Sequence, residues 1–493
     1  MSLLHNLKPL PVWQYFEEIC KIPRLSKNEG KIREYLLRFA AENKLESKED
    51  STGNILITRK ASEGFKNIKT IVLQSHMDMV GEKNADNPHN WDIDPIVPFV
   101  KDGWVAATGT TLGADDGIGI AAQLAILTDI ELKCGKIECL FTVDEETGMT
   151  GAFGLKPDFF EGRILLNLDS EDEGILFIGC AGGMDSVGKI NYSRENTKPG
   201  SSSIEISVKG LRGGHSGDEI HKGFGNAIKI MARLLLGLAE GHEISVSAFN
   251  GGNLRNAIPR EAFATVIFNE SSGTSINEYI PVFLKTIREE FGDLEKDLEI
   301  SSRAVVTPAM VIDRGTIDKL LNAINCFPHG PIAWSKEMPD LVETSTNLAS
   351  VKTSEEGKIT IVTTQRSSVE SAKHHAAGMV ASCMKLAGAV VEHSDGYPGW
   401  KPDISSEILR ITSESYRKLF GKEPLVKAIH AGLECGLFFE KFKGIDMISF
   451  GPTIRGAHTP QEMIEIQTVQ MFWDLLIDVI KNTSSEISSF THK

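Results

Sequence analysis

Histidines and acidic residues gather at the ends of apolar, strand-like segments in the first part of the chain. His76 and Asp78 end one such segment. Glu145 and Glu146 end a second, and Asp169 ends a third. Open α/β sheets place their ligand sites at the carboxyl ends of their strands, so these side chains are expected to meet. Because imidazole and carboxylate groups bind divalent transition metals, the pattern predicts a metal site.

The spacing within each pair indicates separate roles. His76 and Asp78 occupy alternate positions of a strand, so both side chains point to one face and the carboxylate can support the imidazole from behind. The adjacent Glu145 and Glu146 must diverge, which allows one to bind metal while the other acts as a general base.

Two loops add further candidates. Asp115 and Asp116 lie in a glycine-flanked loop before a helix, where one carboxylate can bridge two cations and the other can cap the helix. The spacing does not decide which does which. His458 lies in a loop bounded by glycine and proline. A single carboxylate of this kind is usually a surface residue, so the prediction of a metal centre depends on the whole set.

The segments that carry these residues resemble, in the same order, those of the M20 family of metal-dependent peptidases: SHMDMV, GADDGIG, DEETG, NLDSED and GAHTP. The resemblance covers essentially the whole chain and is strongest to the aminoacyl-histidine (Xaa-His, or β-alanyl-histidine) dipeptidase branch. It implies a zinc-peptidase-like α/β catalytic domain with an inserted lid domain. It also implies a hydrolase that cleaves dipeptides, including Xaa-His dipeptides such as carnosine.

The resemblance further implies two Zn²⁺ ions per subunit, although the same ligand types accept Co²⁺ or Mn²⁺. It assigns two ligands to each ion and a bridge between them: His76 with Asp169, Glu146 with His458, and Asp115 as the bridge. Asp78 would orient His76, and Glu145 would be the general base. A water shared by the two ions would then have its pKa lowered from near 16 toward about 7. In the family, aspartate at position 169 tends to accompany aminopeptidase or dipeptidase activity, whereas glutamate tends to accompany carboxypeptidase or deacylase activity.

Two other functions fit the same residues. One is another M20-type amidohydrolase, such as an aminoacylase, a deacetylase or a tripeptidase. The other is a catalytically silent binding protein that metal stabilises. Glu145 beside a full ligand set disfavours the silent protein, because a structural metal site needs no adjacent unbound carboxylate.

Local patterns predict the elements that position these residues. Short, β-branched runs at 54–60, 69–78, 136–146 and 162–172 alternate with a helix of strong apolar period at 113–129. Such alternation predicts an α/β layer with a mostly parallel central sheet. Ser26 and Glu29 form a capping-box pattern at the start of another helix.

The pattern changes after residue 183. The order strand, helix, strand, strand, helix follows, which is typical of a ferredoxin-like α+β unit, and a second round runs from about Thr316. From residue 397 the α/β pattern returns. We therefore expect a catalytic domain formed by 1–183 and 397–493, interrupted by an α+β lid domain at 184–396 that is apparently duplicated. A chain of 493 residues is in any case too long for one hydrophobic core.

The later parts of the chain hold candidate substrate contacts. His215 lies among glycines, and the resemblance implies that a histidine there stabilises an oxyanion; a turn histidine is the alternative. Arg366 can bind the free carboxylate of a dipeptide through its guanidinium, unless it is a surface arginine. Asn253 and Asn256 are either substrate contacts or turn formers. Glu434 is expected to lie at the edge of the site, next to the amino end of the substrate.

The composition disfavours several classes of partner. The chain has 67 acidic and 52 basic residues, and its formal net charge of −15 disfavours binding to nucleic acid or an anionic membrane. Its 7 cysteines form no C-x-x-C pair, which disfavours a disulfide framework. The start of the chain does not resemble a secretion signal, and no apolar run approaches the roughly 18 residues of a membrane span. We expect a cytoplasmic protein whose partner is a small peptide substrate, and we favour a homodimer.

Overall fold

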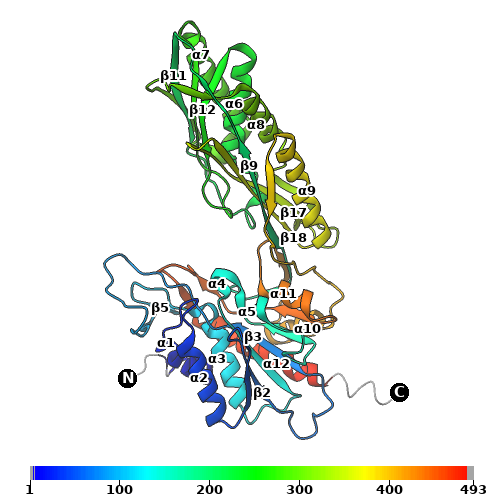
Figure 1. Ribbon diagram of the computed structural model, residues 1–493. Helices are drawn as coiled ribbons and strands as arrows, with labels where there is room; N and C mark the ends of the chain where they lie inside the picture. The colour runs from blue at the N-terminus through cyan, green and yellow to red at the C-terminus, as the bar shows by residue number, and fades with distance from the viewer. Residues whose placement is uncertain (1–3, 5, 486–493) are drawn as a thin grey trace. The chain divides into compact units, whose positions relative to one another are not determined.

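The computed structural model describes residue 4 and residues 6–485, and these form two compact units (Figure 1). Unit 1 comprises the described residues up to Gly179, Trp400–Ala428 and those from Leu433 onward. Unit 2 comprises Cys180–Gly399 and Ile429–Gly432. The α/β fold with a second domain inserted into the first is therefore confirmed.

The short segment Ile429–Gly432 belongs to unit 2, whereas the sequence placed all of 397–493 in the catalytic domain. The amide N–H of Ala181 donates to the carbonyls of Ile429 and Ala431, both at 3.0 Å. His430 Nε2 lies 2.7 Å from Ser345 Oγ. These contacts join residues that are far apart in the chain, so no local pattern announces them.

The main sheet of unit 1 has eight strands in the order β1-β2-β6-β3-β7-β21-β8-β20. The central strands β6, β3, β7 and β21 are parallel, while β1 and β2 pair antiparallel with their neighbours and β8 pairs antiparallel with β21. Every residue of β3, β6 and β7 is buried, which is typical of parallel strands covered on both faces. The strand bounds are β1 Glu46–Glu49, β2 Ile55–Arg59, β3 Ile71–His76, β6 Ile137–Thr142, β7 Ile164–Asn167, β8 Ile175–Cys180, β20 Leu425–Ile429 and β21 Asp446–Ser449.

Helices cover this sheet. Helix α3 packs against β3 and α1, and its residues from Ala114 to Leu127 are all buried, which explains why it is apolar on every side. Helix α10 packs against β21 and α12. The bounds are α1 Leu10–Cys20, α2 Gly30–Glu42, α3 Ala114–Thr128, α4 Glu145–Gly148, α5 Thr150–Gly154, α10 Glu407–Phe420, α11 Glu434–Lys441 and α12 Ile466–Ser485.

A smaller sheet of unit 1 carries the loop of His458. Its four strands have the order β22-β23-β5-β4, and their bounds are β4 Pro98–Lys101, β5 Trp104–Ala107, β22 Ile454–Arg455 and β23 Met463–Glu465. Strands β22 and β23 are antiparallel, so the residues between them form a tight connection. His458 lies in this connection with a left-handed backbone, at φ 63°.

Unit 2 is built on a nine-stranded sheet. The strand order β14-β11-β13-β12 is that of a ferredoxin-like unit, and β19-β9-β18-β17 repeats it from the opposite end of the sheet. Strands β12 and β17 join the two halves, and β16 pairs with β17. The bounds are β9 Gly182–Asn191, β11 Ser201–Lys209, α6 Ala227–Gly241, β12 Ile244–Gly251, β13 Ala262–Asn269, α7 Gly273–Phe291, β14 Glu299–Ala304, α8 Arg314–Cys326, β16 Gly330–Trp334, β17 Val342–Ser354, β18 Lys358–Ser367, α9 Glu370–Leu386 and β19 Val390–His393. A separate ribbon pairs β10 Arg194–Asn196 with β15 Met310–Ile312, and 3-10 turns lie at Ile220–Lys222, Glu270–Ser272 and Gly292–Glu295.

The two ferredoxin-like rounds are nested rather than consecutive. The sequence suggested that the second round begins near Thr316, but its first strand is β9, which precedes the whole first round. Strand β9 pairs along its full length with β18. A pairing of such long range cannot be recognised from local sequence.

The capping box expected at Ser26 and Glu29 is wrong. Helix α2 begins at Gly30 without a side-chain cap. The Ser26 hydroxyl donates instead to Asp78 at 2.8 Å, and Glu29 accepts the amide N–H of Asp144 at 3.0 Å. Ser26 therefore binds a residue distant in sequence, and Glu29 binds both such a residue and the nearby amide N–H of Lys27 at 2.9 Å.

Candidate metal centre

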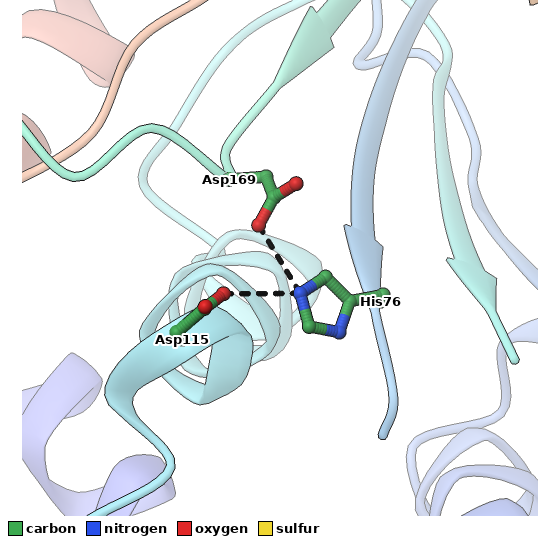
Figure 2. Close-up of side chains that lie close together, drawn as sticks. All are labelled: His76, Asp115 and Asp169. Atoms are coloured by element: carbon green, nitrogen blue, oxygen red, sulfur yellow. Dashed lines mark hydrogen bonds and ion pairs between the residues drawn. The ribbon is translucent and has the colours of Figure 1, made fainter. Parts of the chain in front are cut away.

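Five side chains converge at the carboxyl ends of the parallel strands of unit 1. Figure 2 shows three of them, from the end of β3, the start of α3 and the segment after β7. The other two come from α4, which follows β6, and from the connection between β22 and β23. All five were predicted as ligands from the sequence: His76, Asp115, Asp169, Glu146 and His458.

The side chains form two groups that share one carboxylate. His76 Nε2 lies 3.1 Å from Asp115 Oδ1 and 3.1 Å from Asp169 Oδ1 (Figure 2). His458 Nε2 lies 3.1 Å from Asp115 Oδ2 and 3.0 Å from Glu146 Oε2. Each oxygen of Asp115 therefore faces a different histidine. Asp116 lies outside both groups, and its carboxylate accepts the amide N–H of Gly119 at 3.1 Å.

This geometry fits a pair of metal ions. A ring nitrogen of histidine offers one hydrogen at most, so neither Nε2 can bond to both carboxylate oxygens that face it. Buried carboxylates also repel one another unless a cation compensates them. A divalent cation in each group would accept the nitrogen and the oxygens as ligands, with the carboxylate of Asp115 between the two ions.

The charges of the cluster shift its pKa values. Burial, together with neighbouring carboxylates, raises the pKa of Asp169 to about 7. Burial likewise raises the pKa of Glu145 well above its ordinary value. Hydrogen bonds to Asp115 and Glu146 raise the pKa of His458 to about 11. The cluster thus has an excess of negative charge that bound cations would neutralise.

Asp78 connects the two sides of the cluster. Its Oδ1 lies 3.4 Å from His76 Nδ1, as expected for a carboxylate that orients the imidazole. The same carboxylate accepts the amide N–H groups of Glu145 at 3.0 Å and Glu146 at 3.2 Å. Burial would raise the pKa of Asp78, but the bonds to His76, Ser26 and these amides lower it to about 2. Asp78 therefore fixes the start of α4 as well as the histidine.

Glu145 lies beside the cluster without joining either shared group. A carboxylate oxygen of Glu145 lies within 4.8 Å of ligand atoms of His76 and Glu146. Such a carboxylate can exchange a proton with a group bound at the centre.

Unit 2 holds a cavity of about 220 Å³ lined by Arg366, Asn256 and Tyr397, among others. Arg366 is only 7% exposed, and its Nη1 donates to the Tyr397 hydroxyl at 2.9 Å. Its Nε finds no hydrogen-bond partner among the residues that the structure describes. A buried guanidinium edge of this kind is suited to a carboxylate. Tyr397 was not predicted, because a single tyrosine in a glycine-rich and proline-rich loop carries no signal of its own.

His215 also belongs to unit 2, where its Nδ1 accepts the amide N–H groups of Gly217 and Asp218 at 3.3 and 3.2 Å. The same Nδ1 lies 3.6 Å from Asp218 Oδ2. In the form whose Nδ1 accepts the two amides, the ring proton is on Nε2, and that nitrogen can donate to an oxyanion.

The two other candidates lie elsewhere. Asn253 accepts a hydrogen bond from Lys352 Nζ at 2.8 Å and lines a different cavity of unit 2, of about 420 Å³. Glu434 is fully buried in unit 1, where its carboxylate accepts from Gln74 Nε2 and Thr142 Oγ1, both at 2.7 Å. Burial raises the pKa of Glu434 to about 8. Their contact with a substrate stays a prediction.

Comparison with known proteins identifies the family. Residues 72–482 match the family model described as peptidase family M20/M25/M40. The chain belongs to the M20 peptidase family. It is 41% identical over 481 residues to the cytosol non-specific dipeptidase of Escherichia coli (strain K12), covering 98% of this chain and 99% of that protein.

A solved structure is similar over nearly the whole chain. The aminoacylhistidine dipeptidase from Vibrio alginolyticus matches with a TM-score of 0.92 and 43% identity, covering 97% of this chain and 98% of that one. A tripeptidase from Staphylococcus aureus shares the fold at a TM-score of 0.57 and 18% identity, over 97% of this chain and 100% of that one. These findings confirm the resemblance seen in the sequence and show that the chain is an enzyme of a metal-dependent peptidase family.

Metal removal is expected to destabilise this M20 protein. Chelation should lower the melting temperature measured by scanning calorimetry, and added Zn²⁺ should restore it, because cations relieve the repulsion among the buried carboxylates. At a free concentration about 100 times the dissociation constant, binding stabilises by about 2.7 kcal/mol. Asp115→Ala, which removes the shared ligand, should make the melting temperature insensitive to chelation. A chelation shift in this variant equal to that of the wild type would contradict the assignment.

Proposed function

We propose that the protein is a cytoplasmic dipeptidase that uses two Zn²⁺ ions and cleaves Xaa-His dipeptides, carnosine among them. The observation that supports this best is the pair of ligand groups that share Asp115. Two relatives similar over nearly the whole chain agree with it: one is a cytosol non-specific dipeptidase and the other an aminoacylhistidine dipeptidase.

The chain's own residues supply the remaining parts of the reaction. His76 and Asp169 would hold one ion and Glu146 and His458 the other, with Asp115 between them. When bound, such ions polarise the scissile carbonyl and acidify a water. Glu145 accepts the proton of the attacking water and delivers it to the leaving amine as the peptide bond breaks. Asp78 keeps Glu145 in place through the amide N–H at the start of α4.

Residues of unit 2 would bind and polarise the dipeptide. We assign its free carboxylate to Arg366, because Arg366 and Tyr397 line one cavity and are joined by a hydrogen bond from Nη1 to the Tyr397 hydroxyl. His215 would donate to the developing oxyanion. Asn253 and Asn256 are proposed as further substrate contacts, and Glu434 as a residue near the amino end.

Location and assembly complete the proposal. No helix within residues 4 and 6–485 has the length and apolar character needed to cross a membrane. The cytoplasm is proposed from the name of the Escherichia coli relative. A homodimer, and the lack of nucleic-acid and membrane partners, are proposed from the sequence and its charge.

A substrate panel separates this function from its alternatives. We expect metal-dependent release of free histidine from β-alanyl-histidine and other Xaa-His dipeptides, and slower release of free leucine from Xaa-Leu dipeptides. The free amino acids are measured by chromatography after chelation and after Zn²⁺ is added back. Cleavage of an acetyl-amino acid alone would instead indicate an amidohydrolase of the aminoacylase type. No turnover by metal-loaded protein would indicate a silent binding protein.

The division of labour between the two adjacent glutamates is testable. Glu145→Gln should retain both metal ions but lose about 10²- to 10⁴-fold in kcat, because the amide cannot take the proton. Glu146→Gln is the matched control, and it should lose metal. Metal content by atomic absorption and kcat are measured on the same samples. A parallel loss of zinc in Glu145→Gln would contradict the assigned roles.

The carboxylate contact makes a separate prediction. Arg366→Ala should raise KM for a dipeptide at least about tenfold, since a charged hydrogen bond contributes about 1.5–3 kcal/mol. KM for the same dipeptide amidated at its carboxyl end should change little. Tyr397→Phe, which removes only the hydroxyl, should give a smaller rise. Equal effects of Arg366→Ala on both substrates would rule out this contact.

A further inference from the structure

Glu462 is a buried carboxylate that binds the loop of the shared ligand. It lies between His458 and strand β23 and is only 2% exposed. Its Oε2 accepts the amide N–H groups of Leu112 at 2.8 Å and Gly113 at 2.9 Å. Its Oε1 accepts those of Ala114 at 2.7 Å and Asp115 at 3.3 Å. One side chain thus holds the amides of consecutive residues that end at the shared ligand.

Arg24 holds the same loop through a carbonyl oxygen. Its side chain is 2% exposed, and its Nη2 donates to the carbonyl of Gly113 at 2.5 Å. Its Nη1 donates to the carbonyls of Met77 at 3.0 Å and Asp78 at 2.7 Å, in the segment that follows His76. Arg24 therefore connects the His76 segment to the loop before Asp115.

The packing around Gly113 leaves no space for a side chain at that position. Gly113 has a φ of 69°, which favours glycine, and a Cβ there would lie 2.7 Å from Arg24 Nη2 and 2.8 Å from Met79 Sδ. Both side chains bind the loop before α3. The Arg24 guanidinium donates to a backbone carbonyl of this loop, and the Glu462 carboxylate accepts its backbone amide N–H groups. Glu462 accepts four amide N–H groups and Arg24 donates to three carbonyls, so hydrogen bonds to the backbone stabilise each buried group.

The two side chains link three ligand-bearing segments. Glu462 connects the His458 connection to the Asp115 loop, and Arg24 connects the Asp115 loop to the His76 segment. A bridging carboxylate must point one oxygen at each ion, so a small rotation of its backbone would disturb both sites at once. Groups that orient metal ligands typically change metal affinity by 10- to 100-fold when they are mutated.

We infer that Glu462 and Arg24 are positioning residues that hold the Asp115 carboxylate between the two histidines, and that the affinity of both metal sites depends on them. The inference rests on the proposed metal centre. Neither residue belongs to the two groups that share Asp115. They act through the backbone of the loop that carries the bridge.

Glu462→Gln tests this inference with Zn²⁺ as the probe. The full-length, zinc-loaded protein is competed against a colorimetric chelator, and the zinc retained is measured at each chelator concentration. The glutamine amide would face amide N–H groups with its own N–H donors, so we expect about 10- to 100-fold weaker retention of both ions. The rise in melting temperature on zinc binding should shrink in proportion, a change that a purely structural role would not produce.

Glu138→Gln is the matched control. Glu138 is a buried carboxylate of unit 1 that also accepts backbone amides, from Glu161 and Gly162 at 2.9 Å, but it lies at the opposite end of β6 from α4. The Glu138→Gln protein should have a lower melting temperature than the wild type but should retain zinc equally well. Equal weakening of zinc binding in both glutamine variants would overturn the inference, as would wild-type zinc retention in Glu462→Gln.

Arg24→Lys provides a second variant if Glu462→Gln does not fold. Lysine keeps the positive charge but cannot span the carbonyls of Met77 and Gly113, so zinc retention should again fall. Wild-type zinc retention in Arg24→Lys would contradict the part assigned to Arg24. If the wild-type protein itself retains no zinc, the proposed metal centre fails, and this outcome is distinct from a failure of the positioning role.

Discussion

The confinement of several carboxylates in one buried place is the constraint on which the rest of unit 1 depends. Asp115, Asp169, Glu145 and Glu146 lie close together with two histidines, and burial makes their mutual repulsion costly. Cations relieve that repulsion only if every ligand lies in the correct position. The ends of the parallel strands position several of these side chains, and the connection between β22 and β23 positions His458.

Much of the surrounding structure can be understood as support for this arrangement. Asp78 holds an imidazole on one side and the start of α4 on the other. The segment before α3, in turn, is fixed through its peptide groups by Arg24 and Glu462. Neutral side chains could not do this as well, because an ionised group binds several backbone partners more strongly than an uncharged one. Electrostatics and backbone hydrogen bonding therefore act together at the centre.

The sequence predicted which residues form the two groups around Asp115, and it predicted Asp78 beside His76, but it did not predict Arg24 or Glu462, for a physical reason. Metal ligands belong to few residue types and follow strand ends, so His76 or Asp169 can be recognised from type and position. Glu462 acts on backbone amides, which every residue offers, so its partners leave no trace in their own side chains. The capping-box pattern at Ser26 failed for the opposite reason, because a tertiary partner competed for a side chain that has a good local use.

The nested rounds of unit 2 show a similar limit. The sequence indicated that a second round runs from about Thr316, but β9 was not assigned to it because its partner β18 is distant in sequence. The fold class was nevertheless predictable, since alternation of strands and helices is a local property. Long-range pairing decides topology, and short-range pattern decides only which elements take part.

The strand order of unit 1 has a consequence for the synthesis of the protein. Strand β21, which lies between β7 and β8 in the sheet, comes from residues 446–449, and His458 follows it. Residues up to Ser449 must therefore be synthesised before β7 and β8 can be joined through β21. Both ligand groups contain Asp115. During synthesis, the group that contains His458 is the later of the two to be completed. The nascent polypeptide thus contains all three side chains of the His76 group well before His458 completes the other group.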